Sequence, residues 1–358
     1  MYNQSSIYII GAGGIVNDAH LPAYKIAGFN VQGIFDINTE KAKATAEKFS
    51  IPSYYTSLAD MIAAAHANAV FDMAVPGSET IPILQQLPNS SFVLLQKPMG
   101  ENLAAAKAIL ALVKEKNITA AVNFQLRYAP YILAAKKLFA QKNGVLPGPS
   151  LGDGGCIGTI NDIEVNVNVF TPWHLWNFLK GAPRVEILYH SIHYIDLIRH
   201  LLGNPKSVYA KTTRHPSMPQ LASVRSNIIM DYGDMVAANI LTNHCHNYGT
   251  PKQQSYIKIE GSKGAIKINF GALIDYPRGA ADSFEYVLLE EGKEPEWKTL
   301  AVEGSWFPHA FIGSMEQVLL AANKQIEQPD NNVEDCIHTM ACVEAAYKSS
   351  EMGGTPVP

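Results

Sequence analysis

The sequence has few cysteines and no long apolar run. Its 358 residues include only four cysteines. Their positions, Cys156, Cys245, Cys336 and Cys342, form neither a CxxC motif nor a dense disulfide framework, which favours a reduced, cytoplasmic setting. No stretch of about 18 uncharged apolar residues occurs, so no membrane-spanning helix is expected. The first residues lack a basic segment followed by an apolar one, so we expect no signal peptide.

The sequence also lacks a large excess of charge of either sign. The chain has 28 basic and 32 acidic side chains, a formal net charge of -4, and no cluster of lysine and arginine. Proteins that bind a phosphate backbone need such clusters, so nucleic acid is not expected as a partner. Apolar residues make up 47% of the chain, which is typical of globular proteins. At roughly 150 residues per domain, the length predicts about two domains.

The first 122 residues alternate apolar runs with helical patterns. The apolar runs cover residues 7–10, 31–35, 70–75, 92–95 and 118–122, and helical patterns cover residues 17–27, 41–49 and 103–113. Ser57, with Asp60 three residues later, predicts the start of another helix. Apolar strands that alternate with helices are typical of a doubly wound parallel sheet. We therefore predict an α/β Rossmann domain over residues 1–122.

The remaining residues, 123–358, predict an α+β domain. A helical pattern at 131–140 and a Gly- and Pro-rich loop at 144–158 come first. Polar and apolar residues then alternate at 163–169, 207–213, 227–230, 236–242, 257–260, 265–269 and 284–289. Such strands predict an open, mainly antiparallel sheet with one face buried and one facing solvent or a partner. Helical patterns at 192–202, 310–322 and 333–349 are expected to cover the buried face.

A glycine-rich loop at residues 11–16 directly follows the first apolar run and opens the first helix. Gly11 permits a tight turn, and Gly13 lets a pyrophosphate approach the backbone N–H groups at the positive end of the helix. The third position of this fingerprint is Val16, where Gly or Ala normally allows close packing. Alone, the loop is a weak signal, because an ordinary apolar turn between a strand and a helix has the same pattern.

Asp36 strengthens the interpretation of this loop. It ends the second apolar run 25 residues after Gly11, where an acid accepts hydrogen bonds from ribose hydroxyls and repels a 2′-phosphate. Ile37 and Asn38 follow instead of an arginine, so we expect NAD rather than NADP. The residues expected to bind the cofactor are Gly11, Gly13, Gly14, Ile15, Asp36, Val75, Pro76 and Lys97.

Candidate chemical groups gather in two places. Lys97 follows the apolar run at 92–95, where open α/β sheets bind ligands, although a surface lysine fits the same pattern. In the second region, His193 lies three residues from both Asp196 and His190, so an acid is placed to orient an imidazole. We predict no metal site, because the neighbouring residues at 244–246 point to opposite faces of a strand. Trp173 is a candidate for stacking on a sugar ring or for an ordinary core position.

In combination, these motifs resemble the Gfo/Idh/MocA oxidoreductases. The resemblance rests on the glycine loop followed by His20-Leu21-Pro22, on Gln96-Lys97-Pro98, on the junction at residues 123–127, and on His193 with Asp196. It implies a Rossmann domain followed by a substrate-binding and oligomerisation domain, whose open sheet often packs against that of a second subunit. It therefore implies a homodimer or homotetramer, a nicotinamide cofactor, and oxidation or reduction of a ring carbon of a sugar or cyclitol.

The resemblance also implies roles for individual residues. The family's Glu-Lys-Pro lysine corresponds to Lys97, and the histidine of its Asp-x-x-x-His motif, assigned as acid/base, corresponds to His193. Two positions depart from the family pattern. Gln96 replaces the glutamate, and Tyr189 replaces the aspartate, where a neutral hydroxyl is still able to bind substrate or relay a proton. We therefore expect catalytic roles for Lys97, His193 and Tyr189, and substrate contacts from Arg127, Trp173, His190 and His193.

The leading hypothesis is an NAD(P)-dependent dehydrogenase or reductase that acts on CH–OH groups of a sugar, sugar acid or cyclitol. One alternative keeps NAD bound as a catalyst in a redox-neutral glycosidase. The other is a regulator that binds dinucleotide without catalysis. Loss of a carboxylate at Tyr189 is the only support for a regulator, and the presence of Lys97 and His193 favours an enzyme.

Overall fold

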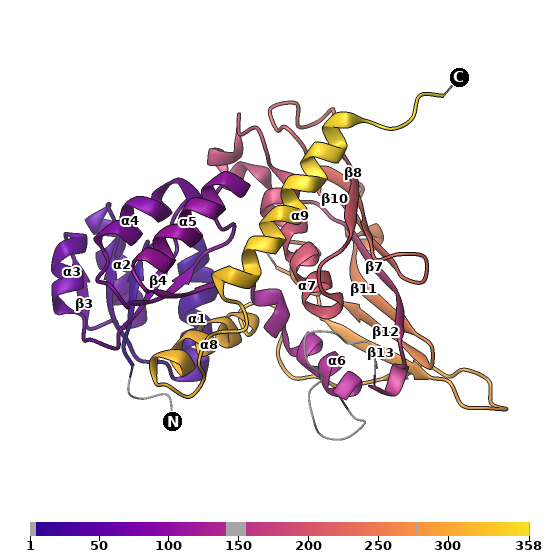
Figure 1. Cartoon of the computed structure of the whole chain (residues 1–358), viewed down its shortest axis with the longest axis horizontal. Helices are drawn as coiled ribbons and strands as arrows, with labels where there is room; N and C mark the ends of the chain where they lie inside the picture. The colour runs from indigo at the N-terminus through magenta and orange to yellow at the C-terminus, as the bar shows by residue number, and fades with distance from the viewer. Residues whose placement is uncertain (1–4, 141–154, 277, 358) are drawn as a thin grey trace. The chain divides into compact units, whose positions relative to one another are not determined.

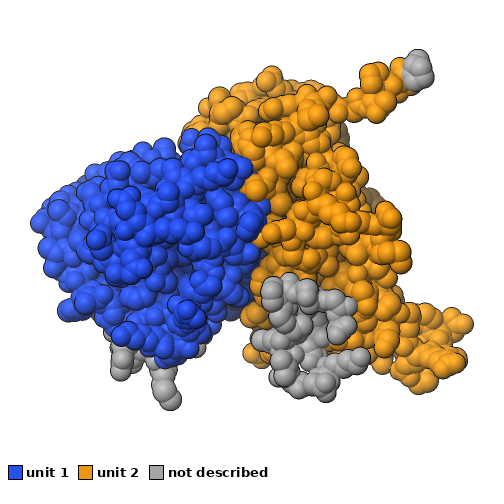
Figure 2. Space-filling model, in the orientation of Figure 1, with its two compact units in different colours: residues 1–128, 307–340 blue, residues 129–306, 341–358 orange. Residues whose placement is uncertain are grey.

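The computed structural model describes residues 5–140, 155–276 and 278–357 (Figure 1). Most of the predicted Gly- and Pro-rich loop lies outside these residues. The chain forms two compact units, coloured separately in Figure 2. Unit 1 contains Met1–Tyr128 and Phe307–Met340, and unit 2 contains Ala129–Trp306 and Ala341–Pro358.

Unit 1 is built on a six-stranded parallel sheet with the order β3-β2-β1-β4-β5-β6. Its strands are β1 (Ile7–Ile10), β2 (Val31–Phe35), β3 (Ser53–Tyr55), β4 (Val70–Met73), β5 (Phe92–Leu95) and β6 (Thr119–Val122). This order is that of the Rossmann fold, so the predicted doubly wound sheet is confirmed. The sequence did not indicate β3, which is short and has no buried residue.

Helices pack on this sheet in unit 1. They are α1 (Leu21–Ala27), α2 (Thr39–Phe49), α3 (Leu58–Ala64), α4 (Thr80–Gln86), α5 (Leu103–Glu115) and α8 (Ala310–Ala322). The predicted start of α3 is confirmed, because the Ser57 hydroxyl accepts a hydrogen bond from the Asp60 N–H at 3.1 Å. Asn38 and Asn102 cap α2 and α5 in the same way. No pattern in the sequence predicted α4, a helix of seven residues.

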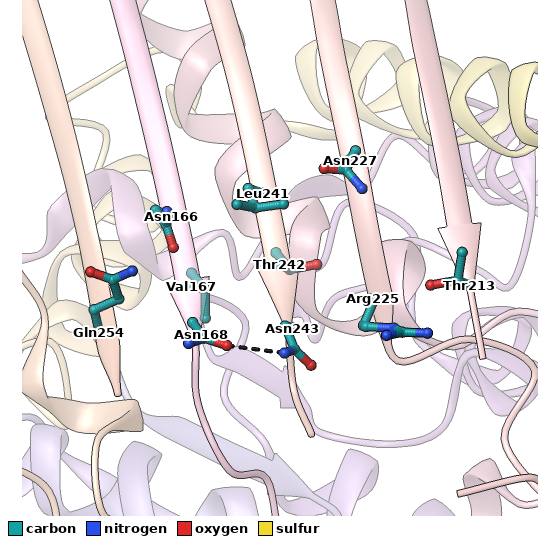
Figure 3. A pocket seen from close by; sticks show the side chains of 10 residues that line it. All are labelled: Asn166, Val167, Asn168, Thr213, Arg225, Asn227, Leu241, Thr242, Asn243 and Gln254. Atoms are coloured by element: carbon teal, nitrogen blue, oxygen red, sulfur yellow. Dashed lines mark hydrogen bonds between the residues drawn. The ribbon is translucent and has the colours of Figure 1, made fainter. Parts of the chain in front are cut away.

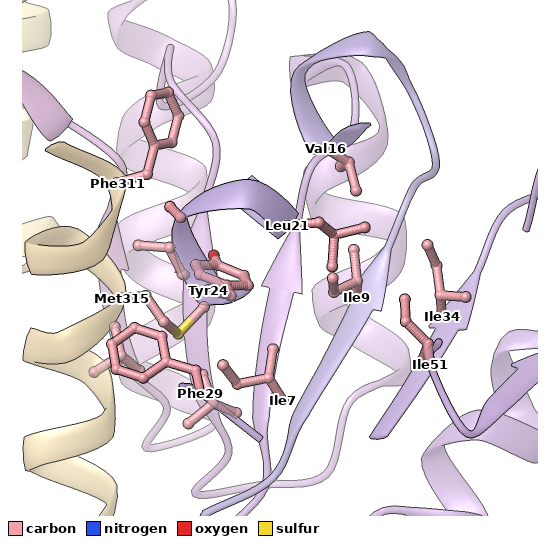
Figure 4. Close-up of a cluster of buried hydrophobic side chains, with 14 of the residues drawn as sticks. Ile7, Ile9, Val16, Leu21, Tyr24, Phe29, Ile34, Ile51, Phe311 and Met315 are labelled. Atoms are coloured by element: carbon pink, nitrogen blue, oxygen red, sulfur yellow. The ribbon is translucent and has the colours of Figure 1, made fainter. Parts of the chain in front are cut away.

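Helix α8 belongs to unit 1, so its predicted place on the second sheet is wrong. Phe311 and Met315 pack into the core that contains Ile7, Tyr24 and Phe29 (Figure 4). Just after α8, the chain runs beside the edge strand β6, where an isolated antiparallel bridge joins Asn332 to Ala121. Apolar periodicity shows that a helix has a buried face, but it does not show which sheet that face meets. The sequence had therefore assigned this segment to the second domain.

Unit 2 contains an eight-stranded sheet with the order β14-β13-β12-β11-β7-β10-β9-β8. Its strands are β7 (Ile160–Asn168), β8 (Ser207–Thr213), β9 (Arg225–Asp231), β10 (Ala237–Asn243), β11 (Gln254–Gly261), β12 (Gly264–Asn269), β13 (Ser283–Leu288) and β14 (Lys298–Thr299). All neighbouring strands are antiparallel except β7 and β10, which are parallel. The predicted open, mainly antiparallel sheet is therefore confirmed.

Helices α6 (Pro130–Ala140) and α7 (Ile192–Leu202) belong to unit 2, and α9 (Val333–Met352) continues from unit 1 into unit 2. The face of the sheet that α7 contacts is buried, with Ile163, Val165 and Val167 alternating along β7. Among the described residues, no helix has the length and apolar character needed to cross a membrane. The four cysteines all lie in the described part of the chain, and none forms a disulfide.

Candidate functional site

The glycine loop of unit 1 is held between two strands. Gly11 has φ +107°, and a Cβ atom there would lie 2.4 Å from the carbonyl oxygen of Ala74, so only glycine fits. Its N–H donates a hydrogen bond to the carbonyl oxygen of Phe35 at 2.7 Å. The Val75 side chain also lies against this position. Contacts with residues that end β2 and follow β4 therefore fix the start of the loop.

The next glycines leave the loop open to a ligand. Gly13 and Gly14 are exposed, and a Cβ atom at Gly13 would have no neighbouring atom within 4 Å. The helical segment begins here, and Ile15 packs partly against the core below. Unpaired backbone N–H groups and the helix dipole favour an anion at such a terminus. An open cradle at this point fits the pyrophosphate of a dinucleotide.

Asp36 lies directly against the loop. One carboxylate oxygen accepts a hydrogen bond from the Ala12 N–H at 2.7 Å, and the other accepts one from the Asn38 N–H at 2.8 Å. Asp36 is partly exposed beside the glycine loop, and the next residue, Ile37, is almost fully open to solvent. Among the predicted cofactor residues, Pro76 is also exposed, at the turn after β4.

A π-helical turn over Val16–His20 connects the loop to α1. Pro22 lies at the start of α1 and has no N–H to donate to the preceding turn, which accounts for the wider hydrogen bonding there. Val16, at the position where the fingerprint has Gly or Ala, is completely buried in the core. The wider turn brings His20 into the interior of unit 1.

Lys97 follows β5 at the carboxyl end of the sheet. The residue is partly exposed, but burial of its amine lowers the pKa of that amine from 10.5 to about 8. The Lys97 backbone N–H donates a hydrogen bond to the side-chain oxygen of Gln96 at 2.9 Å. The residue that replaces the expected glutamate therefore holds the main chain at the lysine.

A buried polar cluster lies next to Gln96. His20 Nδ1 is 2.7 Å from Asp72 Oδ2, and the Tyr24 hydroxyl donates to the same oxygen at 2.7 Å. The side-chain nitrogens of Asn123 and Gln96 lie 3.2 and 3.4 Å from His20 Nε2. Asp72 was not among the residues predicted to belong to the site. A possible signal was present, because an aspartate within an apolar strand needs a buried partner.

In unit 2, another π-helical turn, Ile187–Ser191, leads into α7. It carries the partly exposed Tyr189 and His190, and His193 lies in the first turn of α7. His193 is 8% exposed, and its ring meets Trp306 edge to face with centroids 5.9 Å apart. The three predicted residues thus occupy one continuous helical segment. Rare π-turns occur often at functional sites.

A second buried cluster contacts His190 from the interior of unit 2. The His190 imidazole stacks on that of His244, with centroids 4.3 Å apart and planes 29° apart. His244 Nε2 lies 3.6 Å from Glu186 Oε1, and His244 Nδ1 lies 3.0 Å from the Thr171 hydroxyl. Burial raises the pKa of Glu186, but His244 together with the hydroxyls of Ser226 and Ser191 lowers it below its usual value overall.

No sequence pattern pointed to Glu186, and the pattern at residues 244–246 suggested His244 only as a metal ligand. Glu186 comes three residues before Tyr189, within the buried stretch of residues 185–188. Its partner His244 lies after β10, 58 residues further along the chain. Sequence spacing gives no indication of such a contact.

Two predicted substrate residues occupy interior positions. Trp173 is 3% exposed, packs with Leu179 and Val185, and donates a hydrogen bond to the His244 carbonyl at 3.3 Å. Arg127 is completely buried in unit 1. Its guanidinium donates to the Asp330 carbonyl at 2.9 Å and to the Asp335 carboxylate at 2.6 Å. These contacts favour structural roles for both side chains over the predicted substrate contacts.

The sheet face of unit 2 opposite α7 carries a hollow of about 500 Å³ (Figure 3). Amide side chains at aligned positions of adjacent strands line this hollow. Asn168 pairs in register with Asn243 of β10 and with Gln254 of β11. The Asn243 amide donates a hydrogen bond to Asn168 at 3.0 Å. Leu241, 44% exposed, lies on the same face.

Comparison with known proteins identifies the family. A model described as an oxidoreductase family with an NAD-binding Rossmann fold matches residues 5–124. Its companion, the C-terminal alpha/beta domain of the oxidoreductase family, matches residues 153–358. The chain belongs to the Gfo/Idh/MocA family of oxidoreductases. The predicted family and the predicted NAD(P)-dependent dehydrogenase class are therefore confirmed.

Individual relatives are distant but span nearly the whole chain. A D-xylose 1-dehydrogenase (NADP(+)) from Haloferax volcanii is 21% identical over 96% of this chain and 97% of its own. A D-apiose dehydrogenase from Paraburkholderia graminis is 22% identical over 96% of this chain and 87% of its own. A crystal structure of an Agrobacterium radiobacter oxidoreductase in complex with NAD+, L-tartaric acid and magnesium has a TM-score of 0.77. It is 19% identical and covers 98% of this chain and 97% of its own.

Proposed function

We propose that this protein is an NAD-dependent dehydrogenase or reductase that acts on a CH–OH group of a sugar, sugar acid or cyclitol. The position of Lys97 carries the proposal. This partly exposed residue, whose amine has a pKa lowered to about 8 by burial, follows β5 at the carboxyl end of the sheet that holds the glycine loop. Relatives named as D-xylose and D-apiose dehydrogenases support a carbohydrate-like substrate.

The cofactor is assigned to the loop and its surroundings. Gly13 and Gly14 leave room for the pyrophosphate, while Asp36 is placed to accept hydrogen bonds from ribose hydroxyls. Ile15, Val75, Pro76 and Lys97 complete the proposed binding set. The fixed carboxylate of Asp36 supports NAD over NADP, because it repels a 2′-phosphate.

Lys97 and His193 are assigned the roles that the family resemblance implies. A bound nicotinamide supplies the group that accepts or donates hydride. In oxidation, the imidazole of His193 takes the proton of the substrate hydroxyl. The ammonium of Lys97 stabilises the negative charge that develops on the substrate oxygen. Tyr189 and His190 are assigned to hydrogen bonds with substrate hydroxyls, since both are partly exposed beside His193.

Two variants test these roles. Lys97→Met and His193→Gln are expected to lower kcat by at least about 100-fold, a much larger effect than the weakening of NAD binding. Lys107→Met, an exposed lysine on α5, and His66→Gln, an exposed histidine, are the controls and should keep full activity. Equal losses of NAD binding and turnover in both site variants would contradict the assignment. Release of an aglycone without net NADH would instead identify a redox-neutral glycosidase.

The open face of the unit 2 sheet is assigned to self-association as a homodimer or homotetramer. It exposes Tyr209, Ile229 and Leu241 beside the amide-lined hollow. Leu241→Arg should convert the oligomer to monomers in sedimentation, while Leu289→Arg, at an exposed leucine beyond β13, should not. A wild-type protein that sediments as a monomer would contradict this part of the proposal. Because none of the four cysteines forms a disulfide, we also expect a reducing, cytoplasmic location.

A further inference from the structure

The buried cluster of unit 1 lies at the carboxyl ends of three adjacent strands. Asp72 is in β4, Gln96 follows β5, and Asn123 follows β6. His20 reaches the cluster from the π-helical turn after the glycine loop. His20, Asp72 and Asn123 have no exposed surface, and the ring of Phe311 from α8 lies 5.1 Å from the imidazole. These groups depend on each other for their hydrogen bonds, because water does not reach them.

The direction of each hydrogen bond follows from one fixed donor. A backbone N–H can only donate, so the Gln96 oxygen must face the Lys97 N–H, at 2.9 Å. The Gln96 nitrogen, also a donor, then faces His20 Nε2 at 3.4 Å. Nε2 must therefore accept, and it also receives the Asn123 amide at 3.2 Å.

The proton of His20 is consequently on the other ring nitrogen. Nδ1 lies 2.7 Å from Asp72 Oδ2, within reach for a strong hydrogen bond to a carboxylate. A proton on Nε2 would instead point at two amide donors and would remove both hydrogen bonds. The Tyr24 hydroxyl donates to the same carboxylate oxygen at 2.7 Å and helps to fix Asp72.

We propose that His20 is a positioning residue for Lys97, which it holds through the Gln96 side chain as a neutral imidazole protonated at Nδ1. The connection runs from Asp72 through the His20 ring to the Gln96 amide, and from there to the main chain at Lys97. The positioning role rests on the proposed function of Lys97. The tautomer of His20 does not, since hydrogen-bond geometry alone determines it.

The tautomer is measured directly by ¹⁵N NMR of the full-length protein with labelled histidine. The His20 signals are those lost in His20→Asn, and we expect one protonated nitrogen, Nδ1, and one unprotonated nitrogen, Nε2. In Gln96→Glu, a carboxylate replaces the amide donor, so Nε2 should carry a proton and donate to it. A wild-type His20 that is protonated at Nε2 would overturn the proposal, as would an Nε2 that stays unprotonated in Gln96→Glu.

Kinetics test the positioning role separately. His20→Asn should lower kcat at least about tenfold and raise the KM for NAD much less, because Lys97 is displaced while the glycine loop is kept. Met61→Ala is the control for lost packing, since Met61 is completely buried on α3, which contacts β2 and β3. It should lower Tm but leave kcat within twofold. If His20→Asn does not fold, Gln96→Leu at the partly exposed link should give the same loss of kcat.

The outcomes separate the two proposals. Equal effects of His20→Asn and Met61→Ala on kcat, relative to their effects on Tm, would overturn the positioning role. The expected tautomer together with full activity of Lys97→Met would show that the proposed function of Lys97 fails while the cluster is as described.

Discussion

The carboxylate of Asp36 accepts a hydrogen bond from the backbone N–H of Ala12, with oxygen and nitrogen 2.7 Å apart. The acid is therefore held at the glycine loop before any ligand binds. Asp36→Ala should lower kcat/KM for NAD about tenfold, since a lost pair of ribose hydrogen bonds costs roughly 1–2 kcal/mol. It should also raise kcat/KM for NADP, because the repulsion of a 2′-phosphate is removed. Kinetics with both cofactors test this, with the exposed Glu40→Gln on α2 as control. An unchanged ratio of the two kcat/KM values would contradict the assignment.

Gly11 and Gly13 should contribute to different properties, the first to stability and the second to NAD binding. Gly11→Ala should lower Tm strongly, because its Cβ would lie 2.4 Å from the Ala74 carbonyl oxygen at a φ of +107°. Gly13→Ala should leave Tm nearly unchanged, because no atom lies within 4 Å of its Cβ position. It should nevertheless raise the Kd for NAD at least about tenfold by filling the space for the pyrophosphate. Thermal unfolding and NAD titration of both variants measure the two effects. Equal losses of Tm would contradict this division.

The lowered pKa of Lys97 predicts a decline of activity in alkaline solution. Burial disfavours the ammonium and brings the pKa of Lys97 to about 8, so the cation is present below that pH and lost above it. Because the cation stabilises the developing alkoxide, kcat should fall tenfold for each pH unit well above about 8. Lys97→Arg keeps its charge at these pH values, so its residual activity should not show this decline. A wild-type profile that stays flat to about pH 10 would exclude the assigned role.

Glu186 should make the stability of the protein depend on acid pH. Its pKa is lowered in the folded state, so its stabilising contribution is present above the unfolded-state pKa and is lost as the pH falls through the folded-state value. Glu186→Gln should lower the free energy of unfolding by about 3 kcal/mol near neutral pH, because it leaves His244 without its buried carboxylate.

The difference between Glu186→Gln and wild type should shrink as the pH falls below about 4.3, the ordinary pKa of a glutamate, and on through the lower folded-state pKa. Denaturant unfolding at a series of pH values measures it. The exposed Glu334→Gln, in the first turn of α9, is the control. A difference that is constant over this range would show that the charge of Glu186 does not contribute to stability.

Local sequence patterns predicted most of the fold. The apolar runs and the glycine loop are properties of neighbouring residues, so they identified β1, β2, β5 and the turn at Gly11 directly. The position of α8 was not predictable in this way, because Phe311 and Met315 require only an apolar surface. The short elements β3 and α4 contribute few periodic residues and were missed for that reason.

The residues of the candidate site show the same difference between local patterns and contacts that are distant in sequence. Asp36 was identified because its role depends on a fixed distance from Gly11 along the chain. The contacts of His20 with Asp72, and of Glu186 with His244, join residues far apart in sequence, and no spacing rule reports them. The family resemblance led to the expectation that Arg127 faces substrate, and residue type led to the same expectation for Trp173, with a core position as its alternative. Burial places both in the interior, which residue type does not determine.

The most direct test of the proposed function is the NADH fluorescence of the purified protein. It is measured as isolated and after addition of NAD with a panel of sugars, sugar acids and inositols. We predict a growing NADH signal with one class of substrate, and no such growth with the Lys97→Met variant. Absence of dinucleotide binding would contradict the account of the glycine loop and Asp36, on which the proposed function depends. Tight NAD binding without NADH formation from any substrate would contradict net dehydrogenation.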